Sequence, residues 1–304
     1  MFALLIDPEK CSDEWLCQIL STVNSQTPSA SLVPLKQGDN ILATKISYEK
    51  QGDNILATKI SHKKQGDNIL ATKISYEKQG DNILATKIFH EKQEENINLN
   101  EKQITQLFIF VGGSQLKESI YNTVKKIKQL TQVPVVMFPG DASQFAENVD
   151  ALLFLSLASG RNAKYLIEQH IEAAQAIKSS GVETIPTGYI LVDGGKHTAV
   201  EQISGTSPYP TTDPQLIADT ALACQLLGHK MVYLEAGSGA NHPVPKNIIA
   251  ETRKAIDIPL IVGGGIKTPQ QMIDAFSAGA DLVVIGNHLE SHPEDLTKIL
   301  NTLT

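Results

Sequence analysis

The sequence predicts an α/β fold: a (β/α)₈ TIM barrel with a tandem-repeat insertion between its first helix and its second strand. Eight apolar runs of strand length alternate with helical patterns, and this order indicates a parallel sheet covered on both faces. A 14-residue repeat stands apart from the rest of the chain. Outside the repeat, 248 of the 304 residues remain, close to the roughly 250 residues of a typical (β/α)₈ barrel.

The repeat unit KQGDNILATKISYE begins at Lys36, and four copies fill residues 36–91 within a single barrel domain over residues 1–304. Copies this alike carry no position-specific core, and their period is shorter than the roughly 20–50 residues of stacked solenoids. Surface loops tolerate long insertions because closure entropy grows slowly with length. We therefore expect a disordered or weakly structured loop. The alternative is a small β module, because hydrophobicity alternates along the unit.

The first elements are predicted on both sides of the repeats. Residues 2–6 form an apolar run, and Ser12 followed by two acidic residues is typical of a helix N-terminus. Residues 107–111 are rich in β-forming residues and end in two glycines, and helical spacing follows over 116–130. The next apolar run, 133–138, is closed by Pro-Gly.

Alternation continues to the end of the chain. A short connection leads to an apolar run at 151–157, which precedes a helical pattern at 163–180 and a strand-like run at 184–192. Further helices and strands are expected in turn at 216–227, 231–235, 245–256, 259–262, 270–278, 282–285 and 293–303.

Composition excludes several classes of protein. The 26 basic and 33 acidic side chains give a net charge of −7, which argues against a protein that binds nucleic acid with a basic face. The three cysteines show no CxxC or zinc-ligand spacing and favour a reduced compartment. The N-terminal apolar run lacks a basic leader, and no apolar run approaches the roughly 20 residues of a membrane-spanning helix. We therefore expect a cytoplasmic protein without a signal peptide or transmembrane segment.

A phosphate site is predicted at the carboxyl ends of the strands, where the active sites of (β/α)₈ barrels lie. The last two strands end in glycine, in the sequences IVGGGIKT and VVIGN. Glycine lets backbone N–H groups approach a ligand, and the loops after these two strands commonly bind phosphate. The alternative is that these glycines only form tight turns.

Carboxylates stand at the ends of two other strands. Glu235, in the sequence YLEAGSG, is a candidate general base, because partial burial raises the pKa of a carboxyl group; the alternative is a buried structural glutamate. Asp7 and Ser114 end the first two strands, and a carboxylate and a hydroxyl without histidine suit Mg²⁺ bridged to substrate phosphates. Asp7 also fits a turn before Pro8. Together these residues predict a Mg²⁺-assisted enzyme that acts on phosphorylated substrates.

Eight stretches resemble the geranylgeranylglyceryl phosphate synthase family, including its bacterial heptaprenylglyceryl relatives. They run through essentially the whole chain outside residues 25–105, in the order found in the family: FALLIDPEK, FIFVGGS, VVMFPG, LFLSLASGRN, IPTGYILVDGG, YLEAGSGA, PLIVGGGIKTPQQM and AGADLVVIGN. The repeats depart from the family pattern. So does Leu5, which stands where some relatives place a lysine, and the contact of that lysine to glycerol phosphate is not carried over.

The resemblance implies transfer of a geranylgeranyl group from its diphosphate to the C3 hydroxyl of sn-glycerol 1-phosphate by a homo-oligomer. It places Mg²⁺ at Asp7 and Ser114, and it makes Glu235 the proton acceptor. An apolar tunnel must hold the long prenyl tail, and we expect Leu153 and Ile190 to contribute to its lining; the alternative is that both belong to the ordinary barrel core. The residues that would bind glycerol 1-phosphate are Tyr233, Leu234, Glu235, Ala236, Gly237, Ser238, Gly239, Gly264, Gly265, Gly286 and Asn287.

Two alternatives remain open. One is another phosphate-binding barrel enzyme that acts on a small sugar phosphate, although no lysine stands at a predicted strand end to form a Schiff base. The other is a non-catalytic barrel that presents the repeats to a protein partner. Loss of partner binding with activity retained, after deletion of 36–91, would separate an enzyme from a binding module.

Overall fold

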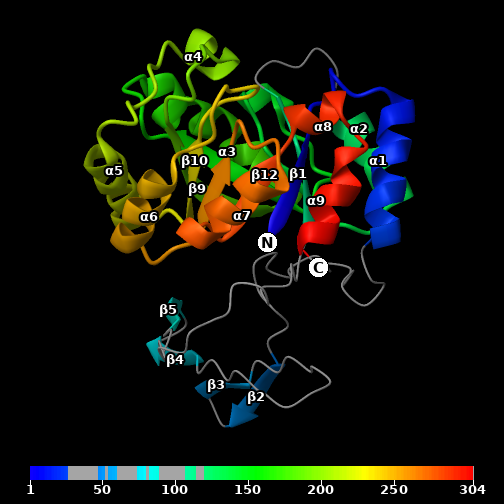
Figure 1. Ribbon diagram of the computed structural model, residues 1–304. Coiled ribbons are helices and arrows are strands. Elements are labelled where there is room, and N and C mark those ends of the chain that lie inside the picture. The colour runs from blue at the N-terminus through cyan, green and yellow to red at the C-terminus, as the bar shows by residue number, and fades with distance from the viewer. Residues whose placement is uncertain are drawn as a thin grey trace. The chain divides into compact units, whose positions relative to one another are not determined.

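The chain forms a closed barrel of eight parallel strands surrounded by helices (Figure 1). This computed structural model describes residues 1–26, 107–113 and 120–303, together with the backbone of four short strands between residues 47 and 88. The strands follow one another around the barrel in chain order, and β1 closes it by pairing with both β6 and β12. The predicted (β/α)₈ barrel is confirmed. Its strands are β1 (Phe2–Ile6), β6 (Leu107–Val111), β7 (Val135–Met137), β8 (Ala151–Leu157), β9 (Glu183–Leu191), β10 (Met231–Glu235), β11 (Leu260–Gly263) and β12 (Leu282–Ile285).

Helices cover the outside of the barrel between these strands (Figure 1). They are α1 (Asp13–Gln26), α2 (Ile120–Leu130), α3 (Gln169–Ser180), α4 (Ala199–Ser204), α5 (Pro214–Leu226), α6 (Lys246–Ala255), α7 (Pro269–Ala278), α8 (Asn287–Ser291) and α9 (Asp295–Leu303), with the short turns η2 (Ala142–Gln144) and η3 (Lys164–Glu168). The sequence did not predict α4 and α8, because fewer than two helical turns leave too little periodicity to detect. Within the described ranges, no helix combines the length and the apolar character needed to cross a bilayer.

Two apolar layers hold the barrel together, because side chains alternate across its wall. Val232 and Leu234 of β10 belong to the main hydrophobic core, whereas the intervening Tyr233 packs against rings from other strands. Its ring centroid lies 5.4 Å from that of Phe138 and 5.3 Å from that of Tyr189. This cluster of three rings fills the barrel interior directly below the carboxyl ends of the strands.

The repeats belong to a second compact unit, Asp39–Glu101, which is separate from the unit formed by Met1–Gly38 and Lys102–Thr304. Its described strands pair as two antiparallel hairpins, in which Gln51 faces Asn54 and Gln79 faces Asn82. The prediction of a disordered or weakly structured loop falls largely on residues outside the described ranges, and it stays a prediction. The hairpin strands are β2 (Ser47–Gln51), β3 (Asn54–Lys59), β4 (Ile74–Gln79) and β5 (Asn82–Ile88).

Candidate functional site

The candidate residues on the last three strands lie side by side at one end of the barrel. Glu235 at the end of β10 pairs in register with Gly263 of β11, and Gly263 pairs with Val284 of β12. Helix α4 lies at this end, and the N-terminus lies at the other (Figure 1). The parallel order of the strands therefore gathers the predicted carboxylate and both glycine sequences into one mouth.

Glu235 is the buried carboxylate of this mouth, with only 6% of the residue exposed. Its Oε1 accepts a hydrogen bond of 2.7 Å from the backbone N–H of Gly237. Burial raises its pKa from 4.5 to about 7, because desolvation disfavours the charged form more than the Tyr233 phenol and the Gly237 N–H stabilise it. The carboxylate can therefore gain or lose a proton near neutral pH, as a general base must.

Two glycines of β11 and its loop make room for β10. A Cβ at Gly263 would collide with the hydroxyl of Tyr233, and a Cβ at Gly264 would collide with Glu235 Oε1 and with the backbone nitrogen of Gly237. Gly264 also has a positive φ of 81°, which side chains disfavour. The glycine run therefore lets the carboxylate and the backbone of the next loop approach each other closely.

Four backbone N–H groups belong to the two loops that follow β10 and β11. Within the described part of the chain, the N–H groups of Ser238, Gly239, Gly264 and Gly265 donate to no other group. Successive N–H groups in left-handed or turn conformations form concave anion-binding sites. We call these four N–H groups the anion nest. Their arrangement suits a phosphate group held beside Glu235.

The loop after β12 joins the same site. Ser238 Oγ donates to Asn287 Oδ1, and Asn287 Nδ2 donates to Glu290 Oε2 at 3.1 Å. A Cβ at Gly286 would lie 3.1 Å from Leu5 Cβ, so the side chain of Leu5 covers this glycine with apolar atoms. Strand β1 therefore brings no cation to the site at this position.

Three of the other predicted binding residues are buried in the barrel. Tyr233, Leu234 and Ala236 are all at least 98% buried. Burial, followed by the neighbouring Glu235 carboxylate, raises the pKa of Tyr233 well above its usual value, so its phenol stays protonated. The Tyr233 ring lies below the mouth, and Leu234 and Ala236 belong to the hydrophobic core.

Asp7 follows β1 at the same end of the barrel. Its Oδ2 forms an ion pair of 2.7 Å with Lys10 Nζ, and its Oδ1 accepts from the backbone N–H of Glu9 at 3.1 Å. The turn considered as the alternative role of Asp7 is therefore present. Ser114 lies outside the described residues, so its pairing with Asp7 stays a prediction. Among the described side chains, no three His, Cys, Asp or Glu residues gather into a metal-binding cluster.

An apolar cavity opens beside the ring cluster and extends behind β8. It encloses about 910 Å³ of empty space, counting its opening to solvent. Its borders include Phe138 and Tyr189 of the ring cluster, Leu152 and Phe154 of β8, and Ala173 and Ile177 of α3. The cavity thus joins the mouth of the barrel to the space between β8 and α3.

The expected lining residues Leu153 and Ile190 do not border this cavity. Ile190 belongs to the core, and Leu153 is 1% exposed. Both residues therefore fit the alternative of ordinary barrel core, and alternation turns Leu152 and Tyr189 towards the cavity instead. The sequence analysis also missed His170, whose ring meets Phe154 edge-on at 4.3 Å between centroids. A histidine in a helix with many polar residues gives no signal that it borders an apolar cavity.

Comparisons with known proteins agree with this geometry. The PcrB family matches residues 84–303. The geranylgeranylglyceryl phosphate synthase of Zunongwangia profunda is 51% identical over 184 residues, which are 60% of this chain and 79% of that protein. The enzyme of the same name from Thermococcus gammatolerans is 41% identical over 184 residues, or 60% of this chain and 72% of that protein.

A solved structure shares the fold. The crystal structure of (S)-3-O-geranylgeranylglyceryl phosphate synthase from Thermoplasma acidophilum, in complex with its substrate sn-glycerol-1-phosphate, matches with a TM-score of 0.69 and 23% sequence identity, over 100% of this chain and 92% of that chain. At this identity the match supports the barrel architecture. Together, the family match and the named relatives do not favour the sugar-phosphate enzyme or the non-catalytic barrel.

Proposed function

The chain belongs to the PcrB family, and on that basis we propose that it transfers a geranylgeranyl group from its diphosphate to the C3 hydroxyl of sn-glycerol 1-phosphate. The reaction forms an ether bond between the C3 oxygen and C1 of the prenyl group, and it breaks the bond from C1 to the diphosphate. The products are diphosphate and a prenylglyceryl phosphate, a precursor of ether lipids. The observation that supports this proposal is a buried carboxylate next to the anion nest, on a strand whose Tyr233 packs against two rings that border the apolar cavity.

The anion nest would hold the phosphate of the acceptor, with its glycerol directed towards Glu235. Glu235 would accept the proton of the C3 hydroxyl as the new C–O bond forms. Its pKa of about 7 leaves about half of the carboxylate ionised at neutral pH. The protonated product form of Glu235 is neutral, which suits its buried surroundings.

The apolar cavity would hold the prenyl tail. Two of its borders, Phe138 and Tyr189, also pack against Tyr233, two residues before Glu235 in β10. A tail in this cavity would therefore place its reactive end close to the acceptor hydroxyl. Holding two reactants in this way supplies much of the entropy of a bimolecular step.

We propose that Mg²⁺ binds at Asp7, with Ser114 as a second ligand. Asp7 Oδ2 already contacts a cation, the ammonium of Lys10, and carboxylate oxygens are ligands that Mg²⁺ prefers. A set of one or two protein ligands fits an ion that completes its coordination with water and substrate phosphates. When bound, Mg²⁺ would neutralise charge on the departing diphosphate.

Homo-oligomeric assembly and a cytoplasmic location belong to the same proposal. The family resemblance supports the first, and the cysteine spacing supports the second.

The test is prenyl transfer to radiolabelled sn-glycerol 1-phosphate, with donors from farnesyl to heptaprenyl diphosphate and with Mg²⁺ or EDTA. We expect a lipid-extractable product that requires Mg²⁺ and that Asp7→Ala abolishes. The most efficient donor reports the length of tail that the cavity accepts. No product from folded protein with any donor would refute the proposed reaction.

A further inference from the structure

The loop that follows β9, residues 193–198, is hydrogen-bonded to the loop after β10, which carries Ser238 and Gly239 of the anion nest. The backbone N–H groups of Asn241 and His242 both donate to Gly194 O, at 3.0 and 3.1 Å. Asn241 Nδ2 also donates to Gly195 O at 2.6 Å. A Cβ at Gly194 would collide with the carbonyl of Ala236, so the two backbones pack in direct contact. These contacts make the two loops one structural piece.

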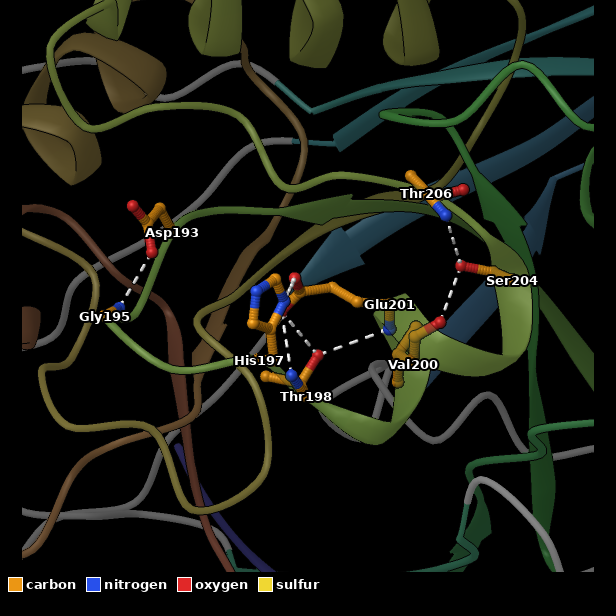
Figure 2. Close-up of polar contacts among 8 residues, drawn as sticks. All are labelled: Asp193, Gly195, His197, Thr198, Val200, Glu201, Ser204 and Thr206. Carbon is orange, nitrogen blue, oxygen red and sulfur yellow. Dashed lines mark hydrogen bonds and ion pairs between the residues drawn. The ribbon is translucent and has the colours of Figure 1, made fainter.

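Both ends of the loop are fixed by their own hydrogen bonds (Figure 2). Asp193 Oδ1 accepts from the backbone N–H of Gly195 at 2.8 Å. Thr198 caps α4 in a reciprocal arrangement with Glu201, whose Oε1 accepts from the Thr198 N–H at 2.9 Å. The methyl group of Thr198 fills the space where a side chain at Gly237 would lie. The backbone position between these two anchors is therefore well defined.

Lys196 lies between these two anchors in the loop after β9, and its ammonium lies beside Gly239 of the anion nest. Nζ is 3.8 Å from the place that a Cβ at Gly239 would take. Within the described part of the chain, Lys196 has no hydrogen-bond or ion-pair partner. Lys10, at the same end of the barrel, is instead paired with Asp7. A cation without a partner thus stands beside N–H donors without a partner.

We propose that Lys196 is a binding residue for the phosphate group of the acceptor, acting together with the anion nest. The inference rests on the proposed function, because it assigns the acceptor to this nest. A phosphoryl group could also come from the diphosphate of the donor. The side of the nest on which Lys196 lies, against Gly239, favours the acceptor, because the loop of Gly239 directly follows Glu235 in the chain.

The expected effect follows from the exposure of the ammonium. Charge-assisted hydrogen bonds are among the stronger polar contacts, but salt and solvent weaken those at the surface. We expect Lys196→Gln to weaken binding of sn-glycerol 1-phosphate about tenfold at low ionic strength, or about 1.4 kcal/mol. The difference should shrink as salt is added, because screening weakens the Coulombic part of the contact.

The experiment is calorimetric titration of the full chain with sn-glycerol 1-phosphate at pH 8.5, where Glu235 is ionised. Lys196→Arg keeps the charge and should bind within about threefold of wild type. Lys178→Gln is the matched control, because it removes an exposed lysine from the last turn of α3 and should leave binding unchanged. In turnover assays at pH 8.5, above the acid limb of the profile, Lys196→Gln should raise KM for the acceptor about tenfold with kcat little changed, the pattern of lost uniform binding.

Three outcomes would overturn the inference. Equal affinities of wild type and Lys196→Gln, with both proteins folded by thermal unfolding, would show that the ammonium does not contact the phosphate. Weaker binding of inorganic diphosphate with unchanged binding of sn-glycerol 1-phosphate would assign Lys196 to the donor. Wild type that binds no sn-glycerol 1-phosphate would refute the proposed function as well, and this result is distinct from the other two.

Discussion

Burial of Glu235 should make the protein less stable as the pH rises, and Glu235→Gln should remove this effect. The pKa of Glu235 is 4.5 in an exposed chain and about 7 in the fold. Between these values the native state binds more protons at this site than the unfolded state. The free energy of unfolding therefore falls as the pH rises from about 4.5 through 7, and the loss is complete above 7.

The size of the effect follows from the two pKa values. A difference from 4.5 to about 7 corresponds to about 3 kcal/mol, at about 1.36 kcal/mol per pKa unit. Glutamine is neutral at every pH and can still accept the hydrogen bond from Gly237. We expect Glu235→Gln to be within about 1 kcal/mol of wild type at pH 5 and more stable by about 3 kcal/mol at pH 8.

Urea unfolding at pH 5 and pH 8 measures this difference. The single tryptophan, Trp15, is a suitable fluorescent probe, because its Nε1 donates to Leu289 O at 3.0 Å and so links α1 to α8. Glu172→Gln on the exposed side of α3 is the control and should follow wild type at both pH values. If the free energies of unfolding of wild type and Glu235→Gln differ by the same amount at pH 5 and pH 8, the raised pKa of the buried Glu235 carboxyl group is refuted.

The same substitution should reduce catalysis. General bases contribute about 10²- to 10⁴-fold, so we expect Glu235→Gln to lose at least about a hundredfold in kcat. In wild type, kcat/KM should rise with pH and level off above about 7, because only the ionised carboxylate accepts a proton. A Glu235→Gln rate within about tenfold of wild type, or a flat wild-type profile, would contradict the role of the base.

Further predictions test other parts of the site. Gly264→Ala should destabilise the fold by about 1–3 kcal/mol and weaken acceptor binding at least about tenfold, because its Cβ collides with Glu235 and its φ is 81°; unchanged calorimetric binding would argue against the anion nest. Ala173→Phe should fill part of the cavity and shift the preferred donor to shorter tails; an unchanged preference in chromatography of the products would contradict the assignment of the tail to this cavity. Deletion of residues 36–91 should leave activity within about threefold of wild type, because surface loops tolerate changes in length; loss of activity in a folded deletion variant would give the repeats a role in the enzyme. Limited proteolysis should cut the repeats before the barrel, and resistance of residues 36–91 would indicate that they fold.

The strand ends were predictable because their signals are local. The apolar run 231–235 gives the bounds of β10 directly, and parallel strands in chain order must place their carboxyl ends together. Glu235 and Gly264 could therefore be assigned to one site without knowledge of any side-chain contact. The close approach between them explains why a glycine follows β11.

The cavity and the loop after β9 depend on contacts between distant residues. Whether Leu152 or Leu153 borders the cavity depends on how α3 packs over β8, and the strand pattern alone does not contain that information. Helix α4 did leave one local sign, since Thr198 and Glu201 have the spacing of a capping box. The position of Lys196 depends on hydrogen bonds from Asn241 to Gly194 and Gly195, and neither partner signals the other in the sequence.

The bound phosphate and the Lys196 ammonium should have opposite effects on the pKa of Glu235. A phosphate in the anion nest brings negative charge close to Glu235, and this charge would raise the pKa of the carboxyl group further. An ammonium on the phosphate offsets that charge and keeps the base ionised near neutral pH. Lys196→Gln should therefore move the acid limb of the pH profile of kcat, measured at saturating acceptor, to higher pH. The control Lys178→Gln should leave it in place, because Lys178 lies in the last turn of α3, at the far end of the barrel.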